Sequence, residues 1–326
     1  MNILVTGGSG FIGTYLVNSL VETGNKVCIL DNNSARGSLQ GRNSEAEFIH
    51  GDICDSVLVD KLVEWSSHVY HLASTVGVMK VMSDPIESLK SSISGGINVL
   101  KACQKFDKRV LITSTSEVYG KIYNESIKEE SDRILGQTKF FRWSYAESKA
   151  LLESVAYAML NEKRPLNFVI VRLFNTVGAG QLAEHGMVIP RFVRAALNDE
   201  PLMVFGDGRQ TRTFCDVRDA TRALIELMNS HLAHGDVFNI GSDEPISIYD
   251  LAVKVKSIAN SQSKIEIVSY QDAYPDGYED MLHRLPNTEK IKKLLNWERE
   301  YNLDEIIDSV IRFEKNLIRN YRSLDR

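Results

Sequence analysis

A glycine-rich turn near the start of the chain, residues 7–13 (GGSGFIG), constrains the fold more than any other feature. A short run rich in Ile, Leu and Val, residues 1–6, precedes it. Residues 11–22 then have apolar side chains at helical spacing and stop near Gly24, a candidate C-cap. Glycines at this place let the backbone turn tightly from a strand into a helix and let a phosphate approach the helix N-terminus. The pattern predicts the opening strand, turn and helix of a dinucleotide-binding fold.

Further strand-like runs follow, separated by stretches long enough for helices. Val, Ile and Leu dominate these runs and turn residues bound them, which is typical of buried parallel strands. We therefore expect an α/β fold with a Rossmann-type, doubly wound parallel sheet, whose ligands bind beyond the carboxyl ends of the strands. The predicted strands are residues 26–31, 46–50, 68–73, 109–114, 167–173 and 237–240.

The regular alternation of strand-like and helical runs ends at about residue 175, so the chain is expected to have two parts. Residues 1–175 are predicted to form the dinucleotide-binding Rossmann domain. Residues 176–326 are predicted to form mainly a smaller C-terminal substrate-binding lobe, with some segments returning to the main sheet. A final helix is expected to serve packing alone. Its apolar stripe is Leu303, Ile306, Ile307, Val310 and Leu317.

Composition excludes several classes of protein. The 326 residues are 43% hydrophobic and 25% charged with 7 prolines, which suits a globular core rather than a disordered, collagen-like or disulfide-scaffold chain. The net charge of −5, without a basic run, argues against a nucleic-acid partner. Apolar stretches are too short to span a bilayer and no signal-peptide pattern precedes the first strand, so a cytoplasmic location is expected.

The four cysteines have no CxxC spacing, so free buried thiols in a reducing compartment are expected, and no metal site is predicted. They are Cys28, Cys54, Cys103 and Cys215.

An acidic residue about 20 positions after the glycine-rich turn strengthens the dinucleotide interpretation. Asp31 ends the second predicted strand, where its carboxylate can accept hydrogen bonds from a ribose 2′-hydroxyl and would repel a 2′-phosphate. This favours NAD over NADP, with Arg36 nearby keeping NADP as the alternative. The residues predicted to bind NAD are Gly7, Gly10, Phe11, Ile12, Gly13, Asp31, Asn32, Asp52, Ile53, Leu72, Ala73, Ser74, Ser114, Tyr145 and Lys149.

Tyr145 and Lys149 stand four residues apart at the start of a predicted helix, residues 144–160, and so share one face. A lysine ammonium near a phenol, with a positive nicotinamide ring close by, is expected to lower the pKa of the tyrosine toward neutrality. A tyrosine tuned in this way can take a proton from a sugar hydroxyl while a hydride leaves for NAD.

The glycine-rich turn, HLAS at 71–74, STSEVYG at 114–120 and YxxxK at 145–149 resemble, in this order and spacing, the extended short-chain dehydrogenase/reductase family of nucleotide-sugar epimerases, dehydratases and decarboxylases. The resemblance continues through 172–178, 206–214 and 283–286, and so covers essentially the whole chain. It implies a tightly held NAD that oxidises the sugar at C4, a UDP-sugar substrate, and a homodimer paired through two helices per subunit, one of them 144–160. It also assigns substrate binding to Asn175, Arg191, Arg212 and Arg284.

The residues after the fifth predicted strand distinguish three reactions of this family. Dehydratases carry an adjacent Asp-Glu pair where this chain has Ser116-Glu117, so dehydration is disfavoured. Simple 4-epimerases usually lack the carboxylate. A glutamate after the serine, together with Arg284 in an HRxP context, is similar to the UDP-glucuronate decarboxylases. On that resemblance the catalytic residues are Ser116, Glu117, Tyr145, Lys149 and Arg284.

The chemistry of decarboxylation is coherent with these residues. Oxidation at C4 makes the C6 carboxylate β to a ketone, so loss of CO₂ leaves an enolate that the ketone stabilises. Ser116 would bind the C4 oxygen, Arg284 would neutralise the carboxylate or enolate, and Glu117 would assist proton delivery to C5. The alternatives are 4-epimerisation, of UDP-glucose and UDP-galactose or of UDP-glucuronate and UDP-galacturonate, and more distantly a non-catalytic NAD-binding sensor.

Overall fold

The centre of the molecule is a seven-stranded, all-parallel sheet with strand order β11-β6-β5-β4-β1-β2-β3. The computed structural model describes residues 1–33, 42–74, 85–122, 126–140, 142–183, 187–273, 281 and 284–324. The strand order reverses between β1 and β4, which is the doubly wound arrangement that the sequence predicts. The strands are β1 Asn2–Thr6, β2 Lys26–Asp31, β3 Glu47–His50, β4 His68–His71, β5 Arg109–Thr115, β6 Phe168–Leu173 and β11 Asp236–Ile240.

The predicted elements agree with the observed ones except at some ends. Helix α1, Phe11–Glu22, has the predicted bounds, but its C-cap is Thr23 rather than Gly24, which follows with a φ of +79°. Strand β4 ends at His71, so the two residues after it belong to the loop at the sheet edge. Helix α6, Arg142–Leu160, begins two residues earlier than predicted.

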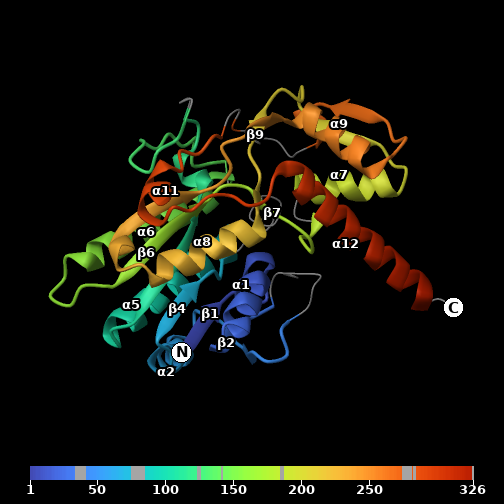
Figure 1. Cartoon of the computed structure of the whole chain (residues 1–326). Coiled ribbons are helices and arrows are strands. Elements are labelled where there is room, and N and C mark those ends of the chain that lie inside the picture. Colours follow the sequence, from blue (N-terminus) through green and yellow to red (C-terminus); the bar gives the residue numbers. More distant parts are fainter. Residues whose placement is uncertain are drawn as a thin grey trace.

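Helices cover both faces of the sheet (Figure 1). Side chains alternate along each strand, so that in β1 Ile3 and Val5 enter one apolar cluster while Leu4 enters the other. The first face is covered by α1 and α8 (Val217–Asn229). The second is covered by α2 (Ser56–Trp65), α5 (Gly96–Lys105) and α6.

A smaller lobe has an apolar core of its own. It consists of α7 (Val188–Leu197), α9 (Ile248–Ala259) and α12 (Leu303–Leu324) with β8 (Leu202–Phe205) and β13 (Ile265–Val268). The predicted stripe of α12 lies partly in this core: Ile306, Ile307 and Val310 are buried, and Leu303 and Leu317 are half-buried. Strand β11 and helix α8 follow residue 175 in the chain but belong to the main sheet and its covering layer.

The remaining elements are short connections. They are α4 Pro85–Lys90, the π-helix η1 Ser91–Gly95, the 3₁₀-helices η2 Ser116–Tyr119 and η4 His231–Ala233, α10 Tyr270–Ala273, α11 Glu289–Leu295, and the strands β7 Thr176–Val177, β9 Thr211–Arg212, β10 Cys215–Asp216 and β12 Ile246–Ser247.

Two further observations concern the cysteines and the helices. All four cysteines are free thiols, three of them buried and Cys54 half-buried. Within the described ranges, the helices are too short or too polar to cross a membrane.

Candidate active site

The glycine-rich turn forms a cradle at the carboxyl edge of the sheet. Gly7 has a φ of +74°, and a Cβ on it would lie 2.6 Å from the Ala73 nitrogen. A Cβ on Gly13 would lie 2.4 Å from the carbonyl oxygen of Gly7, so neither position accepts a side chain. Gly10 is the N-cap of α1 and leaves the first amide groups of that helix without a capping side chain. Because glycines have no side chains in the way, the pyrophosphate of a dinucleotide can reach the free amide groups of this helix N-terminus. Phe11 and Ile12 open the helix: the Phe11 ring stacks edge-on to Tyr15, and Ile12 packs against the core.

Asp31 lies where the ribose acceptor was predicted, beside the glycine-rich turn. Its Oδ2 accepts a hydrogen bond of 3.0 Å from the Ser9 amide, and its Oδ1 accepts one of 2.8 Å from the Asn33 amide. The side chain of Asn32 donates to Asp52 across 3.1 Å, which joins the ends of β2 and β3. Arg36 lies outside the described residues.

The end of β4 lines the next part of the cradle. The amides of Leu72 and Ala73 donate to the carbonyl and hydroxyl oxygens of Thr6, at 3.0 and 3.4 Å. Ser74 shares a hydrogen bond of 3.3 Å with Ser92 in the π-helix η1. Sequence inspection identified no π-helix there, although such helices occur frequently at functional sites.

Ile53 and His71 are both buried. A Cβ on Gly95 would lie 2.4 Å from the Ile53 side chain, so η1 packs closely over it. His71 Nδ1 lies 2.8 Å from the Thr6 hydroxyl. Burial, helped by the charge of Lys149, lowers the pKa of His71 to about 3, so the ring is neutral at physiological pH.

Lys149 and Tyr145 project from the first turns of α6 toward the end of β5. Lys149 Nζ donates to the Thr113 carbonyl across 2.8 Å. Burial lowers the pKa of Lys149 to about 8, against the opposing effect of Glu153. Burial and the Glu117 carboxylate raise the pKa of Tyr145, and a hydrogen bond with Thr115 opposes them. The protein's own groups therefore raise the pKa of Tyr145, mainly through burial, and the lowering expected with a bound nicotinamide ring stays a prediction.

Glu117 and Arg284 meet although 167 positions separate them. Arg284 Nη1 donates to Glu117 Oε1 across 2.7 Å and lies 3.5 Å from the hydroxyl of the buried Ser116. The two charged side chains are 11% and 14% exposed, so the ion pair is largely shielded from water. His283 lies outside the described residues.

Two backbone hydrogen bonds hold the segment that carries Arg284. The Ile127 amide donates to the Leu285 carbonyl across 2.8 Å, and the Asn287 amide donates back to the Ile127 carbonyl across 2.7 Å. The segment is thereby fixed to the loop that follows η2 and Glu117.

The three other predicted substrate residues lie in or next to the smaller lobe. Asn175 follows β6 and donates to the Thr213 carbonyl across 2.9 Å. Arg212 in β9 is buried and donates to the Thr211 carbonyl. Arg191 on α7 donates to the Met203 carbonyl across 2.8 Å, and its guanidinium lies 4.1 Å from the centre of the Phe205 ring.

Sequence reasoning missed a buried pair of charges, Glu153 and Arg172, which lies one helical turn beyond Lys149. Arg172 on β6 bridges both carboxylate oxygens of Glu153 on α6, and the Ser114 hydroxyl donates to the same carboxylate. Two signals were available in the sequence: Glu153 stands four positions after Lys149 on one helix face, and Arg172 interrupts an apolar strand.

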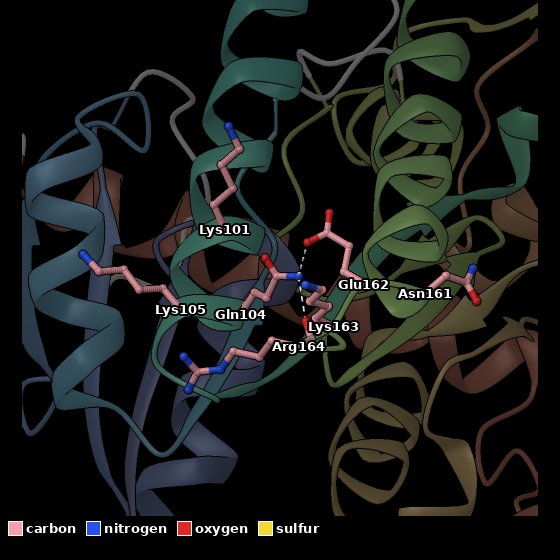
Figure 2. Close-up of a pocket in the computed structure, with 7 residues that line it drawn as sticks. All are labelled: Lys101, Gln104, Lys105, Asn161, Glu162, Lys163 and Arg164. Atoms are coloured by element: carbon pink, nitrogen blue, oxygen red, sulfur yellow. Dashed lines mark hydrogen bonds between the residues drawn. The ribbon is translucent and has the colours of Figure 1, made fainter.

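A pocket on the opposite edge of the sheet contains none of the candidate site residues (Figure 2). It lies where α5 and α6 end and β5 and β6 begin. Gln104 donates there to the Glu162 carboxylate and to the Arg164 carbonyl. Lysines at helix C-termini are ordinary partners of the helix dipole. The lining residues are Lys101, Gln104, Lys105, Asn161, Glu162, Lys163 and Arg164.

Comparison with known proteins decides the family. Residues 3–241 match the model of the NAD dependent epimerase/dehydratase family. The chain belongs to this family. Membership makes it an enzyme with NAD as its cofactor, as the sequence predicts, and the glycine cradle with Asp31 fits that cofactor.

The family members most similar in sequence include decarboxylases. The chain is 37% identical to UDP-N-acetyl-alpha-D-glucosaminuronate decarboxylase of Bacillus cytotoxicus, over 91% of this chain and 94% of that one. It is 31% identical to UDP-glucuronic acid decarboxylase 1 of Danio rerio, over 95% and 72%. Among solved structures, UDP-N-acetylglucosamine 4-epimerase from Methanobrevibacter ruminantium superposes with a TM-score of 0.86 at 26% identity, covering 97% of this chain and 98% of that one.

Proposed function

We propose that this enzyme decarboxylates a UDP-hexuronic acid, with UDP-glucuronate as its first expected substrate. The ion pair of Arg284 and Glu117 beside Ser116 carries the proposal. A guanidinium shielded from water is well suited to bind the carboxylate of a sugar, since the guanidinium offers a planar fork of hydrogen-bond donors. The names of the relatives at 37% and 31% identity support the same reaction. Because the first of them is named for a 2-acetamido sugar, UDP-N-acetylglucosaminuronate is the second substrate to test.

The first step removes hydrogen from the C4 carbinol. The glycine cradle and Asp31 would hold NAD, which would supply the hydride acceptor for C4. Tyr145 takes the proton of the C4 hydroxyl, for which it must ionise against its raised pKa. Lys149, one turn along α6, is largely protonated at neutral pH because its pKa is about 8, and it supplies positive charge that favours the phenolate.

The second step breaks the C5–C6 bond of the 4-keto sugar. The bonding electron pair moves into a C4–C5 enolate and CO₂ leaves. Ser116 donates to the C4 oxygen, and Arg284 stays close to the negative charge as it passes from the carboxylate to the enolate. A proton from water is then added at C5, and Glu117, the carboxylate partner of Arg284, is the side chain proposed to orient that water.

A 4-epimerase is the second candidate. The structural similarity to the Methanobrevibacter ruminantium UDP-N-acetylglucosamine 4-epimerase favours it, since the NAD cradle, Tyr145 and Lys149 suffice for oxidation and reduction at C4. Epimerisation does not require the charges of Glu117 and Arg284 near C5 and C6.

The decisive experiment incubates the purified enzyme separately with UDP-glucuronate, UDP-N-acetylglucosaminuronate and UDP-glucose and analyses the products by mass spectrometry. We expect a uronate to lose the mass of CO₂ when the hydride returns to C4, and the mass of CO₂ and two hydrogens when the 4-keto product leaves first. Interconversion of C4 epimers at constant mass, with no CO₂ released, would replace the decarboxylase with the epimerase.

Variants of the ion pair link the reaction to the site. Arg284→Ala or Glu117→Ala should lower the rate of CO₂ release by about 10²–10³, the usual effect of removing one preorganised charge stabiliser. Lys290→Ala is the matched control, because it breaks the 2.5 Å ion pair with Asp236 at the amino end of β11. Equal rates in all three variants would remove the pair from the mechanism.

We further propose a cytoplasmic homodimer. The outward face of α6 supports pairing through this helix, since Leu151 is 45% exposed and Ser154 and Ala158 are exposed beside it. The four free thiols support a reducing compartment.

A further inference from the structure

A buried polar network lies directly behind the candidate active site, and the proposed mechanism does not use it. Arg172 is at its centre. Its Nε and Nη2 donate to the two carboxylate oxygens of Glu153 across 3.1 and 2.6 Å. The Ser114 hydroxyl donates to the same carboxylate. The network therefore ties β6 to α6, one helical turn beyond Lys149, and to the end of β5.

The other edge of the same guanidinium reaches the η2 region. Arg172 Nη1 donates to the Tyr119 hydroxyl and to the Glu129 carbonyl, both across 2.8 Å. Its central carbon lies 4.7 Å from the middle of the Tyr119 ring. Tyr119 belongs to the short helix that begins with Ser116 and Glu117. One side chain thus contacts both elements that carry predicted catalytic groups.

The network continues to the segment that bears Arg284. The Tyr119 hydroxyl donates to Asn239 Oδ1 across 2.7 Å. Asn239 Nδ2 in turn donates to the Ile127 carbonyl across 3.0 Å and to the Asn287 carbonyl across 3.4 Å. Ile127 and Asn287 are the residues whose backbone bonds hold that segment in place.

Stability alone does not account for this arrangement. Burying two charges costs desolvation free energy that their attraction only partly returns, and apolar replacements of such pairs often stabilise a protein. A planar guanidinium with several hydrogen bonds does, however, fix distances and angles between the elements it joins, which neither an apolar side chain nor a lysine does.

We propose that Arg172 is a positioning residue, which holds Tyr145 and Lys149 on α6 in register with Glu117 and Arg284, so that C4 oxidation and carboxylate binding act on one sugar. The effect of Arg172 on the rate of decarboxylation rests on the proposed function. The effect of Arg172 on NAD binding does not, because Ser114 and Lys149 are predicted NAD contacts in any reaction of the family.

The test compares Arg172→Met and Arg172→Lys with Arg109→Met. Arg109 is a matched control, because it is 6% exposed against 7% for Arg172, lies in the neighbouring strand, and donates to the Leu227 and Ser230 carbonyls at the amino end of the sheet. Both methionine variants should lower the melting temperature. The measurements are kcat and KM for the uronate that the wild type decarboxylates, and the Kd for NAD by calorimetry.

Arg172→Met is expected to lower kcat by about 10²-fold, since a displacement of about 1 Å at a reacting group has that effect, with a much smaller change in KM. Arg172→Lys should regain stability relative to Arg172→Met but keep a reduced kcat, because an ammonium cannot bridge Glu153 and Tyr119 together. Arg109→Met should keep the wild-type kcat. Loss of kcat in Arg109→Met equal to that in Arg172→Met, or full kcat in Arg172→Lys, would overturn the positioning role.

The cofactor titration separates this inference from the proposed function. If the wild type decarboxylates neither uronate, the proposed function fails. Arg172→Met should still bind NAD about tenfold more weakly than the wild type, because displacement of Ser114 or Lys149 would remove one good hydrogen bond to the cofactor. Unchanged NAD affinity in both Arg172 variants, together with unchanged kcat for whichever reaction the wild type performs, would refute the inference. Should Arg172→Met not fold, Arg172→Lys alone carries both measurements.

Discussion

At the scale of single residues, Asp31 shows how a side chain can organise a site as well as bind in it. Its two carboxylate oxygens accept the amides of Ser9 and Asn33, so it holds the glycine-rich turn against the end of β2. The same carboxylate is the predicted acceptor for a ribose diol. Substitution is therefore expected to affect both the turn and the choice of dinucleotide.

Asp31→Ala should weaken NAD binding and reduce the preference for NAD over NADP, because both the hydrogen-bond acceptor and the repulsion of a 2′-phosphate are lost. The loss of one charge-assisted hydrogen bond corresponds to about 1.5–3 kcal/mol, or about 10- to 150-fold in the Kd for NAD. Calorimetric titration with both dinucleotides measures the ratio. Asp55→Ala is the control, since Asp55 also accepts two backbone amides but caps α2. A ratio unchanged by Asp31→Ala would reject the assignment.

At the scale of elements, α6 has two faces of different character. The inner face carries Tyr145, Lys149 and Glu153 toward β5 and β6. The outer face exposes Leu151 with small neighbours, Ser154 and Ala158. Small side chains let two helices approach closely, so this face suits pairing with a second copy of the chain.

Leu151→Glu should therefore weaken the proposed dimer at least about tenfold, since a charge would be buried without a partner. Sedimentation velocity over a range of protein concentrations measures the dissociation constant. Leu232→Glu is the control, because Leu232 is 79% exposed and belongs to η4, away from this helix. A wild-type chain that sediments as a monomer would contradict the dimer itself.

At the scale of the whole molecule, stability is linked to a histidine at the centre of the sheet. His71 is buried at the end of β4, bonded to Thr6 and close to the charge of Lys149, and its pKa is about 3. An unfolded chain takes up a proton at this side chain below about pH 6.5, whereas the folded protein does not until far lower pH. Unfolding is therefore favoured as the pH falls from 6.5 toward 3.

Between pH 7 and pH 5 this histidine should cost the wild type about 2 kcal/mol of unfolding free energy. His71→Asn keeps a polar atom near Thr6 but does not titrate, so its loss over the same interval should be smaller by about that amount. Urea unfolding of both proteins at the two pH values measures the difference, and the other titrating groups cancel in the comparison. Equal losses would mean that His71 is protonated in the folded protein.

Features that depend on neighbours along the chain could be predicted from the sequence. The glycine-rich turn, the alternation of apolar strands with helices, and the four-residue spacing of Tyr145 and Lys149 are local patterns, and each imposes its geometry within a few residues. The parallel pairing of the strands follows from them, since parallel strands need helical crossovers. These features predict that ligands bind at the carboxyl edge of the sheet.

Contacts between residues distant in the chain, and the effect of those contacts on pKa values, depend on the tertiary structure. The pairing of Glu117 with Arg284, and the bridge from Arg172 to Glu153 and Tyr119, join residues whose separation in the chain carries no spacing signal. The pKa of Tyr145 rises because folding buries the phenol beside a carboxylate, an effect of dielectric surroundings that no local pattern encodes. Burial and electrostatic contact depend on the complete packed structure, whereas turn and helix geometry depend on adjacent residues.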